Sequence, residues 1–352
     1  MMNSSFTSSN VFYYSFVFIA IIIASFLAKK VKSAFSENAD EYELIKKYLL
    51  NDNPLEGYNR PKIWIHSKYE LNSRIWQSFQ SRNTMELNQH YLHLTIKSII
   101  NHCGNEFNVC LIDDDSFSKL IPSWQFDLKN MAEPLKSKIR EIGLMELVYF
   151  YGGMVVPNSF LCLKNLKSLY EDECPFICEK VNTHLYLQKQ KRIYEYIPDI
   201  YFIGSKKNNP EILSMVKYLK DKISHPFFYQ EDNFLGCLND YCIELVNSHK
   251  FNLISGDMIG IKTTCGKIIT VDELTNEDYI DFSSNIYGIY LPIDDFLNRT
   301  KYNWFPVMSI EELLESNMII SKYFKSSIME SFKDDELDKK IKSSSKNNTS
   351  SI

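Results

Sequence analysis

The sequence lacks the short motifs that mark several large classes of enzyme. It contains no G-x-x-x-x-G-K-[ST], no G-x-S-x-G and no H-E-x-x-H, which excludes the commonest phosphate-loop, esterase and zinc-protease sites. The body of the chain has no block of like charge and no basic patch, and the formal net charge is only −5. A nucleic-acid partner is therefore not expected.

The eight cysteines show no spacing that is typical of a zinc site or a disulfide scaffold. No paired C-x-x-C occurs, and a disulfide framework is uncommon in a chain of 352 residues. Several cysteines lie within apolar runs, among them Cys110 and Cys162, and we expect these to be small buried side chains. Cys174 and Cys178 have no partner pair nearby, so a metal is not expected there either.

A long apolar run does occur near the start of the chain, over residues 11–28. Its 18 residues include no charge and no proline, and a helix of that length rises about 27 Å, close to the hydrocarbon thickness of a bilayer. Lysines 29, 30 and 32 follow the run, whereas a cleaved signal peptide would carry its positive charge before the run. The sequence therefore predicts a short N-terminal segment, 1–10, and a retained transmembrane helix, 11–28.

The charges that flank this span predict the side of the membrane on which the rest of the chain lies. Residues 1–10 carry no charged side chain and lysines follow the span, so the positive-inside tendency places the large domain in the cytoplasm. Unpaired cysteines agree with a reducing compartment. Glycosylation sequons at Asn3, Asn298 and Asn347 leave a luminal orientation open.

The remainder divides into a stalk, one large domain and a tail. Residues 29–58 are charged and mixed in composition, with a short helix expected from Glu41 to Leu50, and we interpret them as a stalk. Residues 59–332 alternate strand and helix signals, which predicts an α/β domain with a mixed, mainly parallel sheet flanked by helices. Residues 333–352 are rich in Lys, Asp, Ser and Asn and are expected to be disordered.

Short apolar runs predict four strands of this sheet, over residues 61–66, 108–112, 154–156 and 200–203. Capping signals at Asn209 and Ser309 predict the starts of two helices. Ligands of such sheets bind at the carboxyl ends of the strands. The polar residues that fall at these ends are His66, Asp113, Asp114, Asp115, Asn158 and Ser159.

Four features in this order resemble a family of sugar transferases. They are the strand Pro61 to His66, the downstream Trp76, the strand and acidic turn NVCLIDDDS, and the helix and turn ELVYFYGGMVV. Together they resemble the capsular polysaccharide synthesis and DXD-containing glycosyltransferases, roughly from Asn59 to Asp221 and more weakly toward Phe305. The resemblance implies a type-A nucleotide-sugar transferase fold and transfer of a sugar to a glycan or protein acceptor.

The metal-binding motif of that family is degenerate in this chain. Its two aspartates fall at Pro157 and Ser159, with Asn158 between them. A hard cation that bridges a diphosphate needs anionic oxygen ligands, so Mn²⁺ or Mg²⁺ is possible only if a carboxylate outside the motif supplies one. The other motif positions, which in the family are an acid, an arginine and two glycines, are Glu141, Leu144, Gly152 and Gly153.

Nucleotide-sugar contacts are expected from the polar strand ends, each with a structural alternative. The resemblance implies that Asp113–Asp115 contact the base and ribose; alternatively they form a solvated turn in which Asp115 caps the following segment. His66 either touches the diphosphate or is a hydrogen-bonded core residue. Asn158 and Ser159 would border the sugar phosphate. No catalytic base can be assigned from the sequence.

Two functions therefore stay open. In the first, the chain is an active membrane-anchored glycosyltransferase whose metal role is filled by another acid or is not needed. In the second, the fold is kept without catalysis, and the protein binds a glycan or partner or serves as a structural membrane component. The aromatic group Tyr302–Phe305 either stacks on a sugar ring or belongs to the core. The lost aspartates and arginine favour the second function, and the family resemblance favours the first.

Overall fold

A computed structural model describes residues 60–68, 88–122, 124–181, 196–224, 231–298 and 300–328. All of these lie within one compact unit, residues 51–352. The expected transmembrane span, the stalk and the tail fall outside the described residues, as does Trp76. No helix within the described part is long and apolar enough to cross a membrane.

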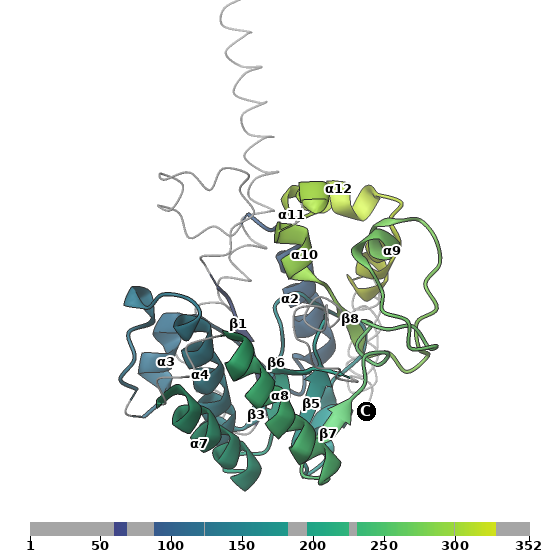
Figure 1. Cartoon of the computed structure of the whole chain (residues 1–352). Coiled ribbons are helices and arrows are strands. Elements are labelled where there is room, and N and C mark those ends of the chain that lie inside the picture. The colour runs from purple at the N-terminus through teal and green to yellow at the C-terminus, as the bar shows by residue number, and fades with distance from the viewer. Residues whose placement is uncertain are drawn as a thin grey trace, which may run out of the picture. The chain divides into compact units, whose positions relative to one another are not determined.

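A six-stranded mixed sheet forms the centre of the described unit (Figure 1), in the order β2-β1-β3-β6-β5-β7. β1 is parallel to β2 and β3, and β5 is parallel to β7, whereas β6 is antiparallel to both β3 and β5. The strands are β1 (Lys62–His66), β2 (Asn108–Ile112), β3 (Gly153–Val155), β5 (Phe176–Glu179), β6 (Pro198–Ser205) and β7 (Asn252–Ile254). The expected mixed, mainly parallel α/β sheet is confirmed, and β1, β2, β3 and β6 match the four expected strands.

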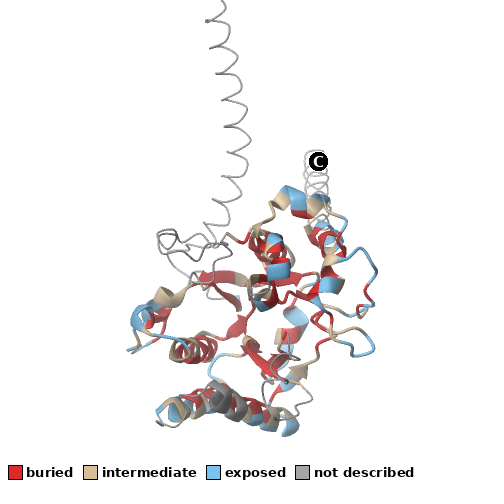
Figure 2. Ribbon diagram, turned by 45° about the horizontal axis from the view of Figure 1, so that its top comes forward, coloured by how far each residue is buried: buried red, intermediate tan, exposed pale blue. Residues whose placement is uncertain are grey.

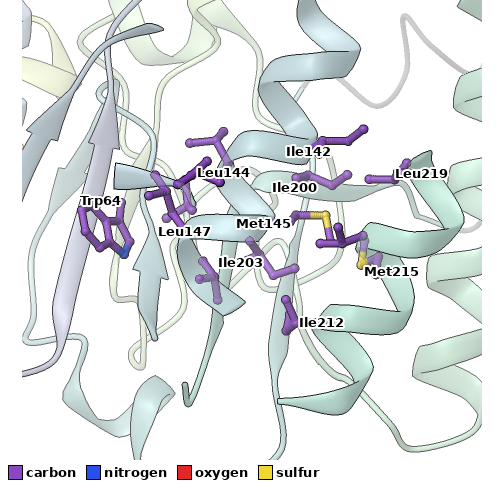
Figure 3. Close-up of a cluster of buried hydrophobic side chains, with 14 of the residues drawn as sticks. Trp64, Ile142, Leu144, Met145, Leu147, Ile200, Ile203, Ile212, Met215 and Leu219 are labelled. Atoms are coloured by element: carbon purple, nitrogen blue, oxygen red, sulfur yellow. The ribbon is translucent and has the colours of Figure 1, made fainter. Parts of the chain in front are cut away.

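Helices on one side of the sheet share a hydrophobic core with it. They are α3 (Asp114–Leu120), α4 (Leu135–Tyr151), α7 (Pro210–Ser224) and α8 (Glu231–Asn247), with the short η2 (Leu128–Asn130). Figure 3 shows side chains of α4, such as Met145, facing Ile203 of β6 and Met215 of α7. Figure 2 shows the central strands and the helix faces turned toward them in the colour of buried residues. Because each apolar stripe is removed from water against the strands, this burial supplies the main driving force for the layer.

A second core lies around α2 (Tyr91–Cys103) and a two-stranded antiparallel sheet of β4 (Phe160–Cys162) and β8 (Gly288–Tyr290). A helical run over 319–328 also contributes to it. Tyr302 and Phe305 are buried here, as expected if this aromatic group belongs to the core, whereas Trp304 is 44% exposed. The other elements are α5 (Lys167–Glu171), α9 (Val271–Thr275), α10 (Ile293–Asn298), η4 (Thr300–Tyr302), α11 (Trp304–Val307) and α12 (Ile310–Glu315).

Local signals placed several boundaries correctly. Asn209 Oδ1 accepts hydrogen bonds from the backbone of Glu211 and Ile212 at the start of α7. Ser309 forms the expected capping box with Glu312 at α12. Both pairings satisfy backbone N–H groups that have no partner inside the helix. Cys110 and Cys162 are buried, which confirms that they act as small core residues.

The double glycine joins α4 to β3 by close approach of two backbones. Gly152 ends α4 with φ of 69°, and Gly153 follows with φ of 94°. A Cβ on Gly153 would collide with the carbonyl oxygen of Lys62 in β1. The indole of Trp64 donates to the Gly152 carbonyl across 3.0 Å. The glycines are therefore required by the packing of β3 against β1, whatever the protein binds.

Gly153→Ala is expected to destabilise the fold by about 3 kcal/mol, because it adds both a left-handed backbone penalty and a steric clash. Gly266→Ala is the matched control, since Gly266 has φ of 79° but no atom within 4 Å of an added Cβ. It should cost only about 1 kcal/mol. Urea unfolding of both variants measures the difference, and equal losses would refute the role of the close approach.

Candidate functional site

The carboxyl ends of β1 and β2 meet in a buried ionic cluster. Arg140 of α4 donates to both carboxylate oxygens of Asp114, through Nε at 2.8 Å and Nη2 at 2.6 Å. His66 Nε2 lies 3.1 Å from Asp114 Oδ1, and its ring stacks on Phe117. The Arg140 side chain is only 1% exposed. A bidentate fork of this kind gives both geometric definition and strength to the pair.

The cluster changes the ionisation of its members. Burial alone would raise the pKa of Asp114, but hydrogen bonds from Arg140 and His66 outweigh it and hold that pKa well below its usual range. Burial lowers the pKa of His66, despite the attraction of Asp114. His66 is therefore hydrogen-bonded in the core, as the structural alternative expects, but its Nδ1 is buried without a hydrogen-bond partner.

The three aspartates of the acidic turn have three different partners. Asp113 caps α3 by accepting from the backbone and hydroxyl of Ser116. The expectation that Asp115 caps this segment is wrong, because Asp113 has the extended backbone that a cap needs. Asp115 instead forms a surface ion pair with Lys129 at 2.8 Å. Contact of this turn with a nucleotide stays a prediction.

Asp114→Asn is expected to destabilise the fold by about 3 kcal/mol at pH 7, because the buried Arg140 then loses its bidentate carboxylate and keeps only the longer ion pair with Glu133, at 3.5 Å. The folded pKa of Asp114 is depressed, so its stabilisation is present above the ordinary value of 3.8 and is lost as the pH falls below it. Unfolding curves should therefore converge below about pH 4. Asp115→Asn, at the surface pair, should cost less than about 1 kcal/mol; a comparable loss in both would contradict the assignment.

A second polar group lines a small cavity between α4, β6 and α8. Its charged and polar lining residues are Glu141, Lys180, Asp199 and Asn239, and its apolar ones are Ile197, Pro198, Ile200 and Leu238. Lys180 follows the end of β5, and its backbone N–H donates to Ile197. Because β6 is antiparallel to β3, its first residues lie at the same edge of the sheet as the carboxyl ends of β1 and β3. The cavity is therefore at the edge where ligands of such sheets bind.

Both acids of this cavity are desolvated, and Glu141 is incompletely paired. Burial raises the pKa of Glu141 to about 7, against the opposing charges of Lys180 and Lys68. Glu141 Oε2 is buried with no hydrogen-bond partner. Burial also raises the pKa of Asp199, which accepts from the Tyr201 backbone and the Tyr290 hydroxyl, each at 3.0 Å. Unsatisfied buried polar atoms are costly, so the cavity is suited to a water molecule or a polar ligand group.

Lys68 and Tyr201 are close enough to both groups to feel the charges of Arg140 in the ionic cluster and of Glu141 in the cavity. The Lys68 ammonium is 4.3 Å from the centre of the Tyr201 ring, a cation–π contact. Burial, and then the charge of Arg140, lowers the pKa of Lys68. The Tyr201 hydroxyl is buried without a hydrogen-bond partner. Together these residues make one continuous polar centre along the edge of the sheet.

Glu141→Gln is expected to make the protein more stable than the wild type above pH 7, by roughly 3 kcal/mol. Because the folded pKa of Glu141 is raised from 4.5 to about 7, ionisation removes stability as the pH rises through this range. The two proteins should be equally stable near pH 4. Glu146→Gln in the same helix breaks an ion pair with Lys220 and should show no such gain. Chemical unfolding from pH 4 to 8.5 tests this, and parallel curves would contradict it.

The degenerate turn Pro157–Ser159 does not fit a divalent metal. The Asn158 carbonyl accepts from Thr95 Oγ1 at 2.6 Å, and the Ser159 carbonyl accepts from the Leu291 N–H. Ser159 is 1% exposed, and no residue of the turn has a carboxylate. In the described part of the chain, no group of three or more His, Cys, Asp or Glu side chains could hold a metal ion. Leu144, at the family's arginine position, is buried in the core of Figure 3.

Sequence reasoning missed most of the polar centre. Arg140, Lys180, Asp199 and Asn239 carry no local motif, and their partners are far away in sequence. A usable signal was the adjacent pair Arg140-Glu141 between Ile139 and Ile142, since charged side chains flanked by apolar ones are seldom buried without partners. No family model matches the chain, and no curated protein matches it either. The family resemblance therefore stays a prediction.

Proposed function

We propose that this chain is a membrane-anchored glycosyltransferase-like protein that binds a nucleotide sugar at the carboxyl edge of its sheet without a divalent metal. If active, it transfers the sugar to a hydroxyl group of a glycan or protein. The observation that carries the proposal is the buried and incompletely paired Glu141 at this edge, beside a cavity with room for about one water molecule or one hydroxyl group.

The lining of the cavity suits a single hydroxyl group of a sugar. Carboxylates accept hydrogen bonds from hydroxyls, while Lys180 and the Asn239 amide supply donors. A sugar is neutral, so its hydroxyl group can form hydrogen bonds with these side chains without changing the balance between the acidic and basic groups. The family resemblance places an acid at position 141, which agrees with a sugar contact by Glu141.

Lys68 is the residue best placed to attract the phosphates of the donor. It lies two residues after the end of β1, close enough to Glu141 to feel its charge, and its ammonium is desolvated against Tyr201. Attraction between charges is stronger in such a setting than in water. In the active form, catalysis would depend on positioning of the donor and stabilisation of the departing diphosphate.

The alternative is a non-catalytic protein of the same fold. The turn Pro157–Ser159 favours it, because its carbonyls are engaged by Thr95 and Leu291 and its side chains are not metal ligands. In that case the polar centre would stabilise the domain or bind a glycan, and the nucleotide would have no site.

Calorimetry of the full-length chain in detergent tests the proposal with UDP, GDP and their sugars, in EDTA and in Mn²⁺. We expect binding that is the same in both buffers, because the family's metal ligands are replaced. Lys68→Met should weaken the binding of the nucleoside diphosphates about tenfold, which corresponds to the loss of one charged contact. Glu141→Ala should weaken the binding of the nucleotide sugars by a similar factor but leave the affinity for UDP and GDP unchanged.

Lys206→Met is the matched control for the Lys68 variant. Lys206 also lies over a tyrosine ring, 3.8 Å from the centre of Tyr170, but it follows the end of β6 at the opposite edge of the sheet. The Lys206→Met variant should bind every ligand with the affinity of the wild type. A folded wild type that binds no nucleotide would support the non-catalytic alternative, and binding that depends on Mn²⁺ would contradict the metal-free site.

A further inference from the structure

Two cysteines from different elements face each other across the contact of α2 with β4. Cys103 ends α2 and Cys162 ends β4, and their sulfur atoms are 4.0 Å apart although the residues are 59 positions apart. Both side chains are fully buried. A disulfide bond is about 2 Å long, so the sulfurs have to close by about the same distance to bond.

The backbone around this pair is held from both sides. The Cys162 N–H donates to Ser98 Oγ of α2 at 2.9 Å, and Ser327 Oγ donates to the Cys162 carbonyl at 2.7 Å. The first bond fixes β4 against α2 and the second fixes it against the helical run 319–328, so approach of the sulfurs needs side-chain movement rather than rearrangement of the elements. The Cys162 thiol also donates to the Lys164 carbonyl at 3.2 Å, and this hydrogen bond has to open before a disulfide can form. Cys110 and Cys174 likewise direct their thiols to backbone carbonyls.

The two thiols also differ in acidity. The hydrogen bond with Cys162 lowers the pKa of Cys103, while burial raises the pKa of Cys162 well above its ordinary value. The thiolate is the form that reacts with oxidants. Because both side chains are fully buried, the oxidant reaches them only when the protein opens locally or is still folding. Cys103 is then the sulfur that reacts first, and Cys162 is the one that resolves the product.

We propose that Cys103 and Cys162 form a reversible disulfide bond when the protein meets a peroxide. The Cys103 thiolate attacks one oxygen of hydrogen peroxide, the O–O bond breaks, and hydroxide leaves and takes up a proton to give water. The sulfenic acid on Cys103 is then attacked by the Cys162 sulfur, the S–O bond breaks, and a second water leaves with the Cys162 proton. Two thiols are oxidised by two electrons in total, and one peroxide is reduced to two waters.

The bond would fasten the turn Pro157–Ser159 to the domain. Thr95 of α2 already holds the Asn158 carbonyl, and β4 follows this turn directly. A cross-link from α2 to β4 would therefore restrict the edge of the proposed nucleotide-sugar site. The pair also reports on the compartment, since such a bond persists in an oxidising lumen and is reduced in the cytoplasm.

The test uses the full-length chain, treated with hydrogen peroxide either folded or during refolding, and then alkylated and digested with trypsin and a glutamate-specific protease. Cleavage after Glu106 separates Cys103 from Cys110. We expect a peptide that joins Cys103 to Cys162, and a rise in Tm of roughly 5 °C that a phosphine reductant reverses. Mass mapping of the wild type decides the pairing without any substitution.

Two variants complete the experiment. Cys103→Ala should abolish both the linked peptide and the rise in Tm, whereas Cys110→Ala, another buried cysteine, should retain both. The proposal is overturned if Cys103 and Cys162 remain separately alkylated after both treatments, or if either sulfur is found joined mainly to a different cysteine. This outcome is independent of nucleotide binding, so it does not depend on the proposed function.

Discussion

β3 is only three residues long, yet it joins the parallel strands β1 and β2 to the antiparallel β6. This joint requires the backbone of Gly153 to approach that of Lys62 more closely than any side chain would allow. It also fixes the end of α4, because Gly152 terminates the helix and its carbonyl is bound by Trp64. Once α4 is anchored in this way, its N-terminal half lies above the carboxyl edge of the sheet, and so do Arg140 and Glu141.

The two polar groups at this edge differ in how well their charges are compensated. In the first group, the Asp114 carboxylate is hydrogen-bonded to Arg140 and His66, so its charge is well compensated. In the second, Glu141 and the Tyr201 hydroxyl are buried with unpaired oxygen atoms beside a cavity. Burial of an uncompensated polar group costs free energy. A ligand that pairs with the second group would therefore stabilise the protein most. The first group holds α3, α4 and the strand ends in position around it.

Prediction from the sequence succeeded where the interactions are local. β1 and β2 are short apolar runs with clear ends, and the caps at Asn209 and Ser309 depend on neighbours within three residues. It failed where the outcome depended on backbone geometry or distant partners. Asp113 and Asp115 are equally able to cap by composition, and only the extended conformation of Asp113 decides between them. β5 and β7 were not predicted, and their place in the sheet depends on pairing with β6 and with each other.

The sequence by itself determined the α/β class, the strands β1, β2, β3 and β6, and the location of polar residues at the strand ends. Apolar runs and turn residues encode these features locally. Only the tertiary structure decided that Arg140 pairs with Asp114, that Glu141, Lys180 and Asp199 share a cavity, and that Cys103 meets Cys162. Each of these contacts joins residues that are brought together by strand order and helix packing, and neither property can be read from the spacing of residues along the chain.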